Sequence, residues 1–326
     1  MKLTEAFFHG QHHIVTEQDG MLTPYRLSTD RIAFYSQEND VFAPRAENSS
    51  GISIEFESSA DEFTLDVRFC NEVRNENSLS IYEDGHLTQI VGITWAEPKT
   101  KLIYLKKNQL KLGQTCRYAI YLPTMATASV QNLSAEDATP LPRRIKQLLA
   151  LGDSITQGVY AQASANGYAT RLARKFGMEL CNQGVGGYYF NSDAFVKDAD
   201  PSIITIAYGI NDISRLEALP PAEIAPFILK CAEGCFAKLQ MLYPGIPMIC
   251  LTPLWRADFR AEQIPAFEAL TEGLLKLCAQ YQITAINGCA AFPHDTDLFT
   301  DGYLHPNDDG FAIMADTIAS VMAEMV

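Results

Sequence analysis

The sequence is short of basic side chains. It carries 25 Lys and Arg against 39 Asp and Glu in 326 residues, which gives a formal net charge of −14. Nucleic acids and anionic membranes attract clustered Lys and Arg, so this balance argues against either as a partner. It favours a neutral small-molecule or oligosaccharide substrate. It does not bear on self-association, so a homo-oligomer is allowed.

Long apolar runs and paired cysteines are also missing. No stretch approaches the roughly 18 apolar residues of a membrane helix, and the first residues do not resemble a secretory signal. The eight cysteines are scattered without a CxxC pair, which predicts free thiols in a cytoplasmic protein. Cys231 and Cys235 stand one helical turn apart, but core packing is favoured over a metal pair. With no HExxH or dinucleotide signature, we expect neither a metal nor a cofactor.

The first part of the chain shows apolar residues with a period of two. Residues 51–58 and 62–70 alternate most clearly, and Asp84-Gly85 is a turn dipeptide. Short alternating strands predict an antiparallel β-sandwich or jelly roll. Residues 1–50 contain no convincing helix, so we assign residues 1–140 to one all-β domain that supports or shapes a substrate site.

A different pattern follows a polar, Pro-containing stretch at 131–147, which we interpret as a linker or domain-crossing segment. Over residues 147–326, short apolar strands alternate with helical segments, and the last helix carries apolar residues from Phe311 to Met325. Such alternation predicts a parallel sheet covered on both faces. Ligands of such sheets bind outside the carboxyl ends of the strands.

The first strand of this second domain ends in Gly152-Asp153-Ser154. A small polar turn at such a place can expose a Ser hydroxyl beside a helix-start amide. The segment lacks the Lys of a Walker A loop, and it lacks the GxSxG of an α/β-hydrolase elbow. Taken alone, these three residues are better explained as a simple turn.

Three further blocks come where other loops of this edge are expected. They are residues 182–187 (NQGVGG), 209–212 (GIND) and 301–308 (DGYLHPND). With Gly152-Asp153-Ser154, these blocks resemble the GDS, NxGxxG, GxND and DxxH blocks of the SGNH hydrolases, also called GDSL esterases or lipases. The resemblance covers about residues 147–326. It implies a flavodoxin-like, three-layer α/β/α hydrolase domain.

The resemblance also implies roles for individual residues. Ser154 would be the nucleophile and His305 the general base. The backbone N–H groups of Ser154 and Gly187, with the side-chain amide of Asn211, would form the oxyanion hole. Asp153 would bond backbone groups around its turn without a catalytic role.

The fourth block departs from the family pattern. The family's Asp stands three residues before His, where this chain has Gly302, and Asp301 stands four before His305. Gly302 could absorb the extra residue as a bulge, so we expect Asp301 to orient His305. The alternatives are a backbone carbonyl or Asp297.

Several side chains are candidates for substrate binding. Trp255 follows the fourth strand and could stack on a sugar or pack on a helix. Arg256 could hold a carboxylate or form a surface ion pair. Tyr188 and its neighbour Tyr189 could wall the pocket. His294 is interpreted as a loop residue.

The leading hypothesis is a serine esterase that removes a short acyl group, with acetyl expected, from a carbohydrate or another small ester. The order of domains resembles carbohydrate esterases in which a jelly roll precedes an SGNH domain. One alternative is an acyltransferase of the same fold. Another is a non-catalytic carbohydrate-binding protein, favoured only by the irregular spacing at Asp301.

Overall fold

The computed structural model describes residues 2–71, 73, 78–92, 99–135 and 137–326. The chain folds into two compact units. Unit 1 comprises Met1–Ile145 with the short segments Ala161–Asn166 and Glu179–Cys181. Unit 2 comprises Lys146–Tyr160, Gly167–Met178 and Asn182–Val326.

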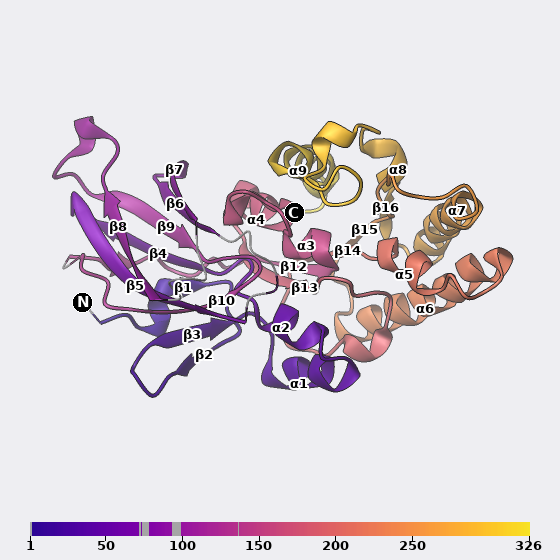
Figure 1. Ribbon diagram of the computed structural model, residues 1–326, viewed down its shortest axis with the longest axis horizontal. Helices are drawn as coiled ribbons and strands as arrows, with labels where there is room; N and C mark the ends of the chain where they lie inside the picture. Colours follow the sequence, from indigo (N-terminus) through magenta and orange to yellow (C-terminus); the bar gives the residue numbers. More distant parts are fainter. Residues whose placement is uncertain (1, 72, 74–77, 93–98, 136) are drawn as a thin grey trace. The chain divides into compact units, whose positions relative to one another are not determined.

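Unit 1 contains two antiparallel sheets (Figure 1). One has the order β1-β4-β9-β6-β7, with β11 also paired to β4, and the other has the order β2-β3-β10-β5-β8. The strands of the first sheet are β1 (Phe8–His9), β4 (Ser53–Ser58), β6 (Ser78–Glu83), β7 (His86–Gly92), β9 (Cys116–Tyr121) and β11 (Thr139–Pro140). Those of the second are β2 (His13–Thr16), β3 (Leu22–Tyr25), β5 (Glu62–Cys70), β8 (Lys99–Leu105) and β10 (Thr127–Gln131).

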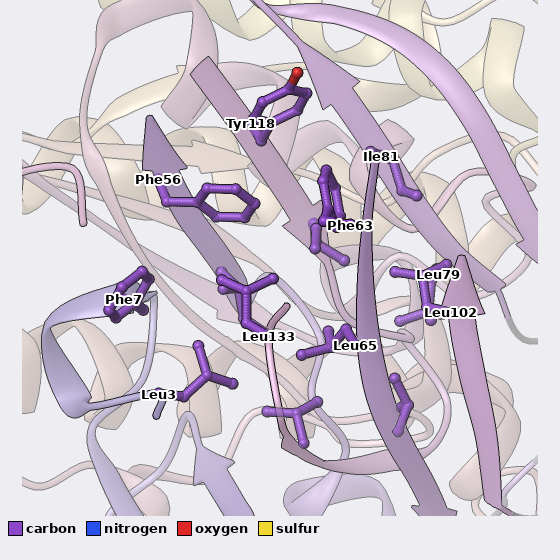
Figure 2. Packing of buried hydrophobic residues seen from close by; sticks show 14 of the residues in the cluster. Leu3, Phe7, Phe56, Phe63, Leu65, Leu79, Ile81, Leu102, Tyr118 and Leu133 are labelled. Carbon is purple, nitrogen blue, oxygen red and sulfur yellow. The ribbon is translucent and has the colours of Figure 1, made fainter. Parts of the chain in front are cut away.

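Apolar residues of both sheets enter one buried cluster (Figure 2). In β5, every second residue from Phe63 to Phe69 is buried, which is the alternation expected for a strand with one face on a core. The Phe63 ring centroid lies 5.3 Å from that of Phe56 and 5.2 Å from that of Tyr118. The assignment of this unit as a jelly roll stays a prediction.

Helices near the start of unit 1 contradict the expectation of an all-β region. α1 (Thr29–Glu38) begins at Ser28, whose hydroxyl accepts a hydrogen bond from the Arg31 N–H. α2 (Phe42–Glu47) follows. In α1 only Arg31 and Tyr35 are buried. The helix therefore has no continuous apolar stripe, which is the signal that identifies helices in a sequence.

The stretch after β10 is more than a linker. Leu133, Ala135 and Ala138 belong to the buried cluster of unit 1, and β11 pairs with β4. The polar residues around them hide this role, because burial of isolated small side chains leaves no period in the sequence.

Unit 2 is built on a five-stranded sheet with the order β13-β12-β14-β15-β16. Numbered within this sheet, the order is 2-1-3-4-5, which is flavodoxin-like. The pairs from β12 to β16 are parallel. The strands are β12 (Gln147–Gly152), β13 (Glu179–Gly184), β14 (Ile203–Ala207), β15 (Met248–Leu251) and β16 (Thr284–Ile286).

Helices cover both faces of this sheet, as predicted. α4 packs with α9 on one side of the strands, and α6 packs with α7 on the other (Figure 1). The helices of the unit are α3 (Ser154–Gln157), α4 (Tyr168–Phe176), α5 (Ile210–Arg215), α6 (Pro221–Leu242), α7 (Ile264–Gln280), α8 (Gly288–Ala291) and α9 (Asp308–Met322). The three layers of the α/β/α hydrolase fold are therefore present. The loops after β12, β13 and β14 carry three of the motif blocks.

Candidate active site

Ser154 lies at the carboxyl end of β12, where the chain turns directly into α3. Asp153 is the N-cap of this helix, and its side chain accepts a hydrogen bond from the Ile155 N–H at 2.9 Å. Ser154 is only 6% exposed. The turn is therefore a fixed feature that presents a hydroxyl at the edge of the sheet.

The loop after β13 packs closely on this turn. The Val185 N–H donates to the Gly152 carbonyl at 3.0 Å, and the Asn182 side chain donates to the Thr156 carbonyl at 2.9 Å. Only glycine fits at position 184, because a Cβ there would collide with the Gln157 backbone nitrogen. The glycine thus allows two loops to meet, and the loop then continues to Gly187 with φ +79°.

Asn211 comes from α5, just after β14. Its Nδ2 donates to Asp153 Oδ2 and to the Tyr188 carbonyl, both at 3.1 Å. The side-chain amide is therefore held between the Ser154 turn and the loop that contains Gly187. The structure brings all three predicted oxyanion-hole residues into neighbouring segments of unit 2.

His305 is buried and lies between a hydroxyl and a carboxylate. Its Nε2 lies 2.9 Å from Ser154 Oγ, and its Nδ1 lies 2.6 Å from Asp301 Oδ2. An ionised carboxylate only accepts hydrogen bonds, so Nδ1 carries the proton and Nε2 is free to accept the Ser154 proton. Ser154, His305 and Asp301 are thus connected in one line.

The extra residue between Asp301 and His305 is accommodated in a tight turn. Gly302 adopts φ +78°, a left-handed conformation that suits glycine. Asp301 Oδ1 then accepts backbone N–H bonds from Tyr303, Leu304 and His305 at 3.2, 2.9 and 3.0 Å. The carboxylate is therefore fixed by the very turn that lengthens the spacing.

The same contacts keep Asp301 ionised. Partial burial favours its neutral form, but the hydrogen bonds from His305 and the turn amides outweigh that effect and hold the pKa of Asp301 well below its usual range. Asp297, the alternative partner, is exposed. Among the hydrogen bonds of the described residues, Asp301 is the carboxylate that meets His305.

Two other acids lie close to the site and behave differently. Burial raises the pKa of Asp153 to about 7 and that of Asp212 to about 7. Asp212 Oδ1 accepts the Phe190 N–H at 3.2 Å, whereas its Oδ2 is buried and has no hydrogen-bond partner among the residues that the structure describes. Each of these carboxyl groups therefore carries a desolvation cost when it ionises.

Tyr188 is not where the sequence prediction placed it. Its side chain is buried, and its ring stacks on Tyr189 with centroids 4.7 Å apart. Tyr188 therefore cannot line a pocket in this conformation. Its carbonyl, which contacts Asn211, is the part of the residue that faces the site.

Trp255 and Arg256 each have partners within unit 2. The Trp255 ring stacks on His294, with centroids 5.0 Å apart and an interplanar angle of 9°. It thus packs on a loop rather than a helix, with one ring face covered. Arg256 forms a two-pronged ion pair with Asp258, in which both N···O distances are 2.8 Å. This is the ion-pair alternative rather than a free carboxylate-binding group.

Tyr160 is a site residue that the sequence interpretation missed. Its ring meets the His305 imidazole edge-on, with centroids 5.3 Å apart. Its backbone has φ +69°, which is uncommon for a residue other than glycine. Nothing in the local sequence marks it, because the contact joins residues that are far apart in the chain.

A cavity of about 730 Å³ lies beside α7 and α8. His294, which stacks on Trp255, lines it, whereas Ser154 and His305 do not. The remaining lining residues are Phe267, Glu268, Thr271, Glu272, Leu275, Asn287, Cys289, Ala290, Phe292 and Pro293. The cavity is therefore separate from the Ser154 hydroxyl.

Possible metal ligands gather elsewhere in the described part of the chain. Glu83, Asp84 and Cys116 of unit 1 have ligand atoms within 4.8 Å of one another. Asp84 is already paired with Lys111, and Glu83 accepts a hydrogen bond from Tyr104. Such satisfied groups fit a local polar network better than a metal site. All eight cysteines, Cys231 and Cys235 of α6 included, are free thiols.

A flavodoxin-like sheet with a Ser-His-Asp contact at its carboxyl edge is typical of a serine hydrolase. A model of the GDSL-like lipase/acylhydrolase family matches residues 150–313, just over half of the chain. The chain therefore belongs to this family, and it is a carboxylic ester hydrolase. The curated proteins contain no match to it.

Solved structures share the fold at low sequence identity. The salicylyl-acyltransferase SsfX3 from a tetracycline biosynthetic pathway has a TM-score of 0.77 and 17% identity, covering 97% of this chain and 94% of that one. A GDSL-like lipase structure from Bacteroides ovatus has a TM-score of 0.77 and 18% identity, covering 100% and 97%. A family two carbohydrate esterase from Cellvibrio japonicus has a TM-score of 0.67 and 13% identity, covering 100% and 97%. No helix among the described residues is both long and apolar enough to cross a membrane.

Proposed function

We propose that the protein is a serine esterase that removes a short acyl group, with acetyl expected, from a carbohydrate or another small neutral ester. The observation that carries this proposal is the line of contacts from Ser154 Oγ through His305 to Asp301, at 2.9 and 2.6 Å. This geometry suits proton transfer from the hydroxyl to the imidazole during attack on a carbonyl carbon.

In the proposed reaction, Ser154 Oγ bonds to the ester carbonyl carbon while its proton passes to His305 Nε2. The tetrahedral intermediate collapses, and His305 returns the proton to the leaving alcohol. Water then attacks the acyl-enzyme, gives its proton to His305 and releases the acid, after which Ser154 regains its proton. Asp301 holds the imidazole and stabilises its positive charge throughout.

Negative charge develops on the carbonyl oxygen, and we assign its donors to the Ser154 and Gly187 N–H groups and to Asn211 Nδ2. One Asn211 hydrogen rests on the Tyr188 carbonyl in the free protein. A substrate oxygen would take over this hydrogen. Removal of one such donor typically lowers kcat about 10²–10³-fold.

The preference for a neutral carbohydrate ester rests on two supports. The chain carries a net charge of −14, which disfavours anionic substrates. A solved structure of a family two carbohydrate esterase shares the fold. A cytoplasmic location is part of the proposal, supported by the eight free cysteines.

The test is hydrolysis of p-nitrophenyl acetate and p-nitrophenyl octanoate by the wild type, Ser154→Ala and Ser320→Ala. Ser320 is an exposed serine of α9 and serves as the matched control. We expect Ser154→Ala to be inactive, Ser320→Ala to match the wild type, and acetate to be strongly preferred. Wild-type activity in Ser154→Ala would refute the assignment.

Acyl transfer to an alcohol other than water is the second candidate. It is favoured by the fold shared with an acyltransferase over 97% of the chain. Product analysis with an acetylated sugar and a second sugar as acceptor separates the two, since only transfer yields a new ester. The non-catalytic alternative loses its supporting feature, because Asp301 reaches His305 despite the irregular spacing.

The other expectations stay predictions. These are an accessory or substrate-shaping role for residues 1–140, the lack of nucleic-acid and membrane partners, and self-association. Arg256 and Trp255 remain proposed substrate neighbours. Arg256 would contact substrate through atoms not engaged by Asp258, and Trp255 through the ring face that His294 does not cover.

A further inference from the structure

Asp153 is a buried carboxylate without a role in the reaction steps above. It is 1% exposed, and its oxygens accept hydrogen bonds from two separate parts of the site. Oδ1 accepts the Ile155 N–H at 2.9 Å, and Oδ2 accepts from Asn211 Nδ2 at 3.1 Å. The first bond fixes the turn that carries Ser154. The second reaches a residue that is 58 positions away in the chain.

Both bonds require an acceptor, and an ionised carboxylate supplies two. A side-chain amide supplies one acceptor oxygen and one donor group. Asn at position 153 would therefore satisfy one partner and direct N–H groups at the other. A flip of the Asn211 amide would not relieve this contact between donors, because the Asn211 oxygen would then face the Tyr188 carbonyl.

We propose that Asp153 is a positioning residue, whose single carboxylate sets the Ser154 turn and the Asn211 amide relative to each other. The inference rests on the proposed function, in which these two groups are the nucleophile and an oxyanion donor. Misplacement of a reacting or stabilising group by about 1 Å can cost roughly 10²-fold in rate. Because the donor acts on the transition state, the loss falls on kcat rather than on KM.

The protonation of Asp153 provides an independent readout. Burial raises its pKa to about 7, Asp212 adds to the rise, and the Ile155 N–H and Arg256 oppose it. Tyr168 is a further ionisable group whose charge interacts with it. Protonated Asp153 carries an O–H donor on one oxygen, and that oxygen is a weaker acceptor, so one of the two hydrogen bonds is weakened as it is in Asp153→Asn. The wild type should therefore resemble this variant at low pH.

The experiment measures kcat and KM for p-nitrophenyl acetate in Asp153→Asn, Asn211→Ala and the double variant. We expect Asp153→Asn to lower kcat about 10²-fold with KM nearly unchanged. In the Asn211→Ala background the same change should cost less than about threefold, because the amide that it misplaces is gone. The ratio of wild-type to Asp153→Asn kcat should shrink more than about tenfold between about pH 8.5 and about pH 5.5. Because the two proteins are compared at each pH, any pH dependence that they share cancels from this ratio.

Two further variants separate positioning from folding. Asp153→Ser keeps an N-cap oxygen for the Ile155 N–H but is too short to reach Asn211, so it should lose kcat like Asp153→Asn. Asp212→Asn removes the other buried acid while keeping an acceptor for the Phe190 N–H, and it should stay within about threefold of wild-type kcat. Circular dichroism and thermal unfolding confirm that each variant is folded.

The outcomes decide between the proposals. Additive losses in the double variant, or an unchanged kcat in Asp153→Ser, overturn the role of Asp153. If the role of Asp153 is overturned while Ser154→Ala is inactive in the same assay, the proposed esterase function still stands. Wild-type activity in Ser154→Ala overturns both.

Discussion

Asp301→Asn is the sharpest test of the catalytic line. Three backbone N–H groups point at Asp301 Oδ1, so the oxygen of an Asn at this position must stay there. Its NH₂ group is then directed at His305 Nδ1, which lies 2.6 Å from Oδ2 in the wild type. A donor at this place forces Nδ1 to accept, and the imidazole proton moves to Nε2. His305 can then no longer take the proton of Ser154.

The expected loss is large because the wrong tautomer blocks the first step. The corresponding substitution in a Ser-His-Asp triad lowers kcat about 10⁴-fold. At about 1.36 kcal/mol per factor of ten, this is about 5.4 kcal/mol of transition-state stabilisation. The assay is steady-state hydrolysis of p-nitrophenyl acetate at about pH 8, with thermal unfolding as a check on the fold.

Asp297→Asn is the matched control for this test. Asp297 is an exposed acid in the preceding turn, and its backbone carbonyl, which accepts from Asn307, is unaffected by the change. Its kcat should stay within about twofold of the wild type. A kcat within about threefold of the wild type in Asp301→Asn would show that this carboxylate does not set the tautomer. A large loss in Asp297→Asn alone would identify the alternative orienting residue.

Three other perturbations test neighbouring features. Gly187→Ala places a side chain at φ +79°, so we expect the free energy of unfolding to fall by about 1–2 kcal/mol, as measured by denaturant unfolding. We also expect a lower kcat in steady-state kinetics, because the Gly187 N–H shifts. Asp212 has a folded pKa raised to about 7, so its stability contribution is full below its unfolded pKa of about 3.9 and declines as the pH rises toward 7. The Tm of Asp212→Asn minus the Tm of the wild type should therefore be larger at about pH 8 than at about pH 5. The same Tm difference at both pH values would contradict ionisation of a buried Asp212. Tyr160→Ala removes an aromatic contact with His305 that is worth about 0.5–1.5 kcal/mol, so kcat should fall about threefold to tenfold. An unchanged kcat would show that the Tyr160 ring does not hold the imidazole in place.

The sequence was most informative where a pattern repeats or a motif is local. The alternation of strands and helices in residues 147–326 and the four blocks located the loops that the structure brings together. The flavodoxin-like strand order was implied by the family resemblance, because the sequence of an apolar strand does not determine which strands it pairs with. By contrast, α1 went unrecognised because only Arg31 and Tyr35 are buried on it.

Contacts between distant residues could not be inferred in the same way. Tyr160 meets His305, and Asp153 meets Asn211, only because loops from different strands converge at one edge. The burial of Tyr188 has the same origin, since an aromatic residue after a glycine fits a pocket wall or a core equally well. Periodicity constrains which face of an element is buried, but it carries no information on which loops meet.

The turn at Gly302 shows why the spacing of a motif is weaker evidence than its geometry. Catalysis requires the distance from a carboxylate to Nδ1, and two turns of different length can supply the same distance. Here the added residue takes φ +78°, and the freed backbone N–H groups converge on Asp301 Oδ1. The longer turn thus orients the carboxylate by three hydrogen bonds that no spacing rule describes. It follows that Gly302→Ala should disturb the site through the backbone alone, because a Cβ at this position has open space around it. A lower kcat with KM unchanged would support that view, whereas a loss of stability without an effect on kcat would show that the turn tolerates other conformations.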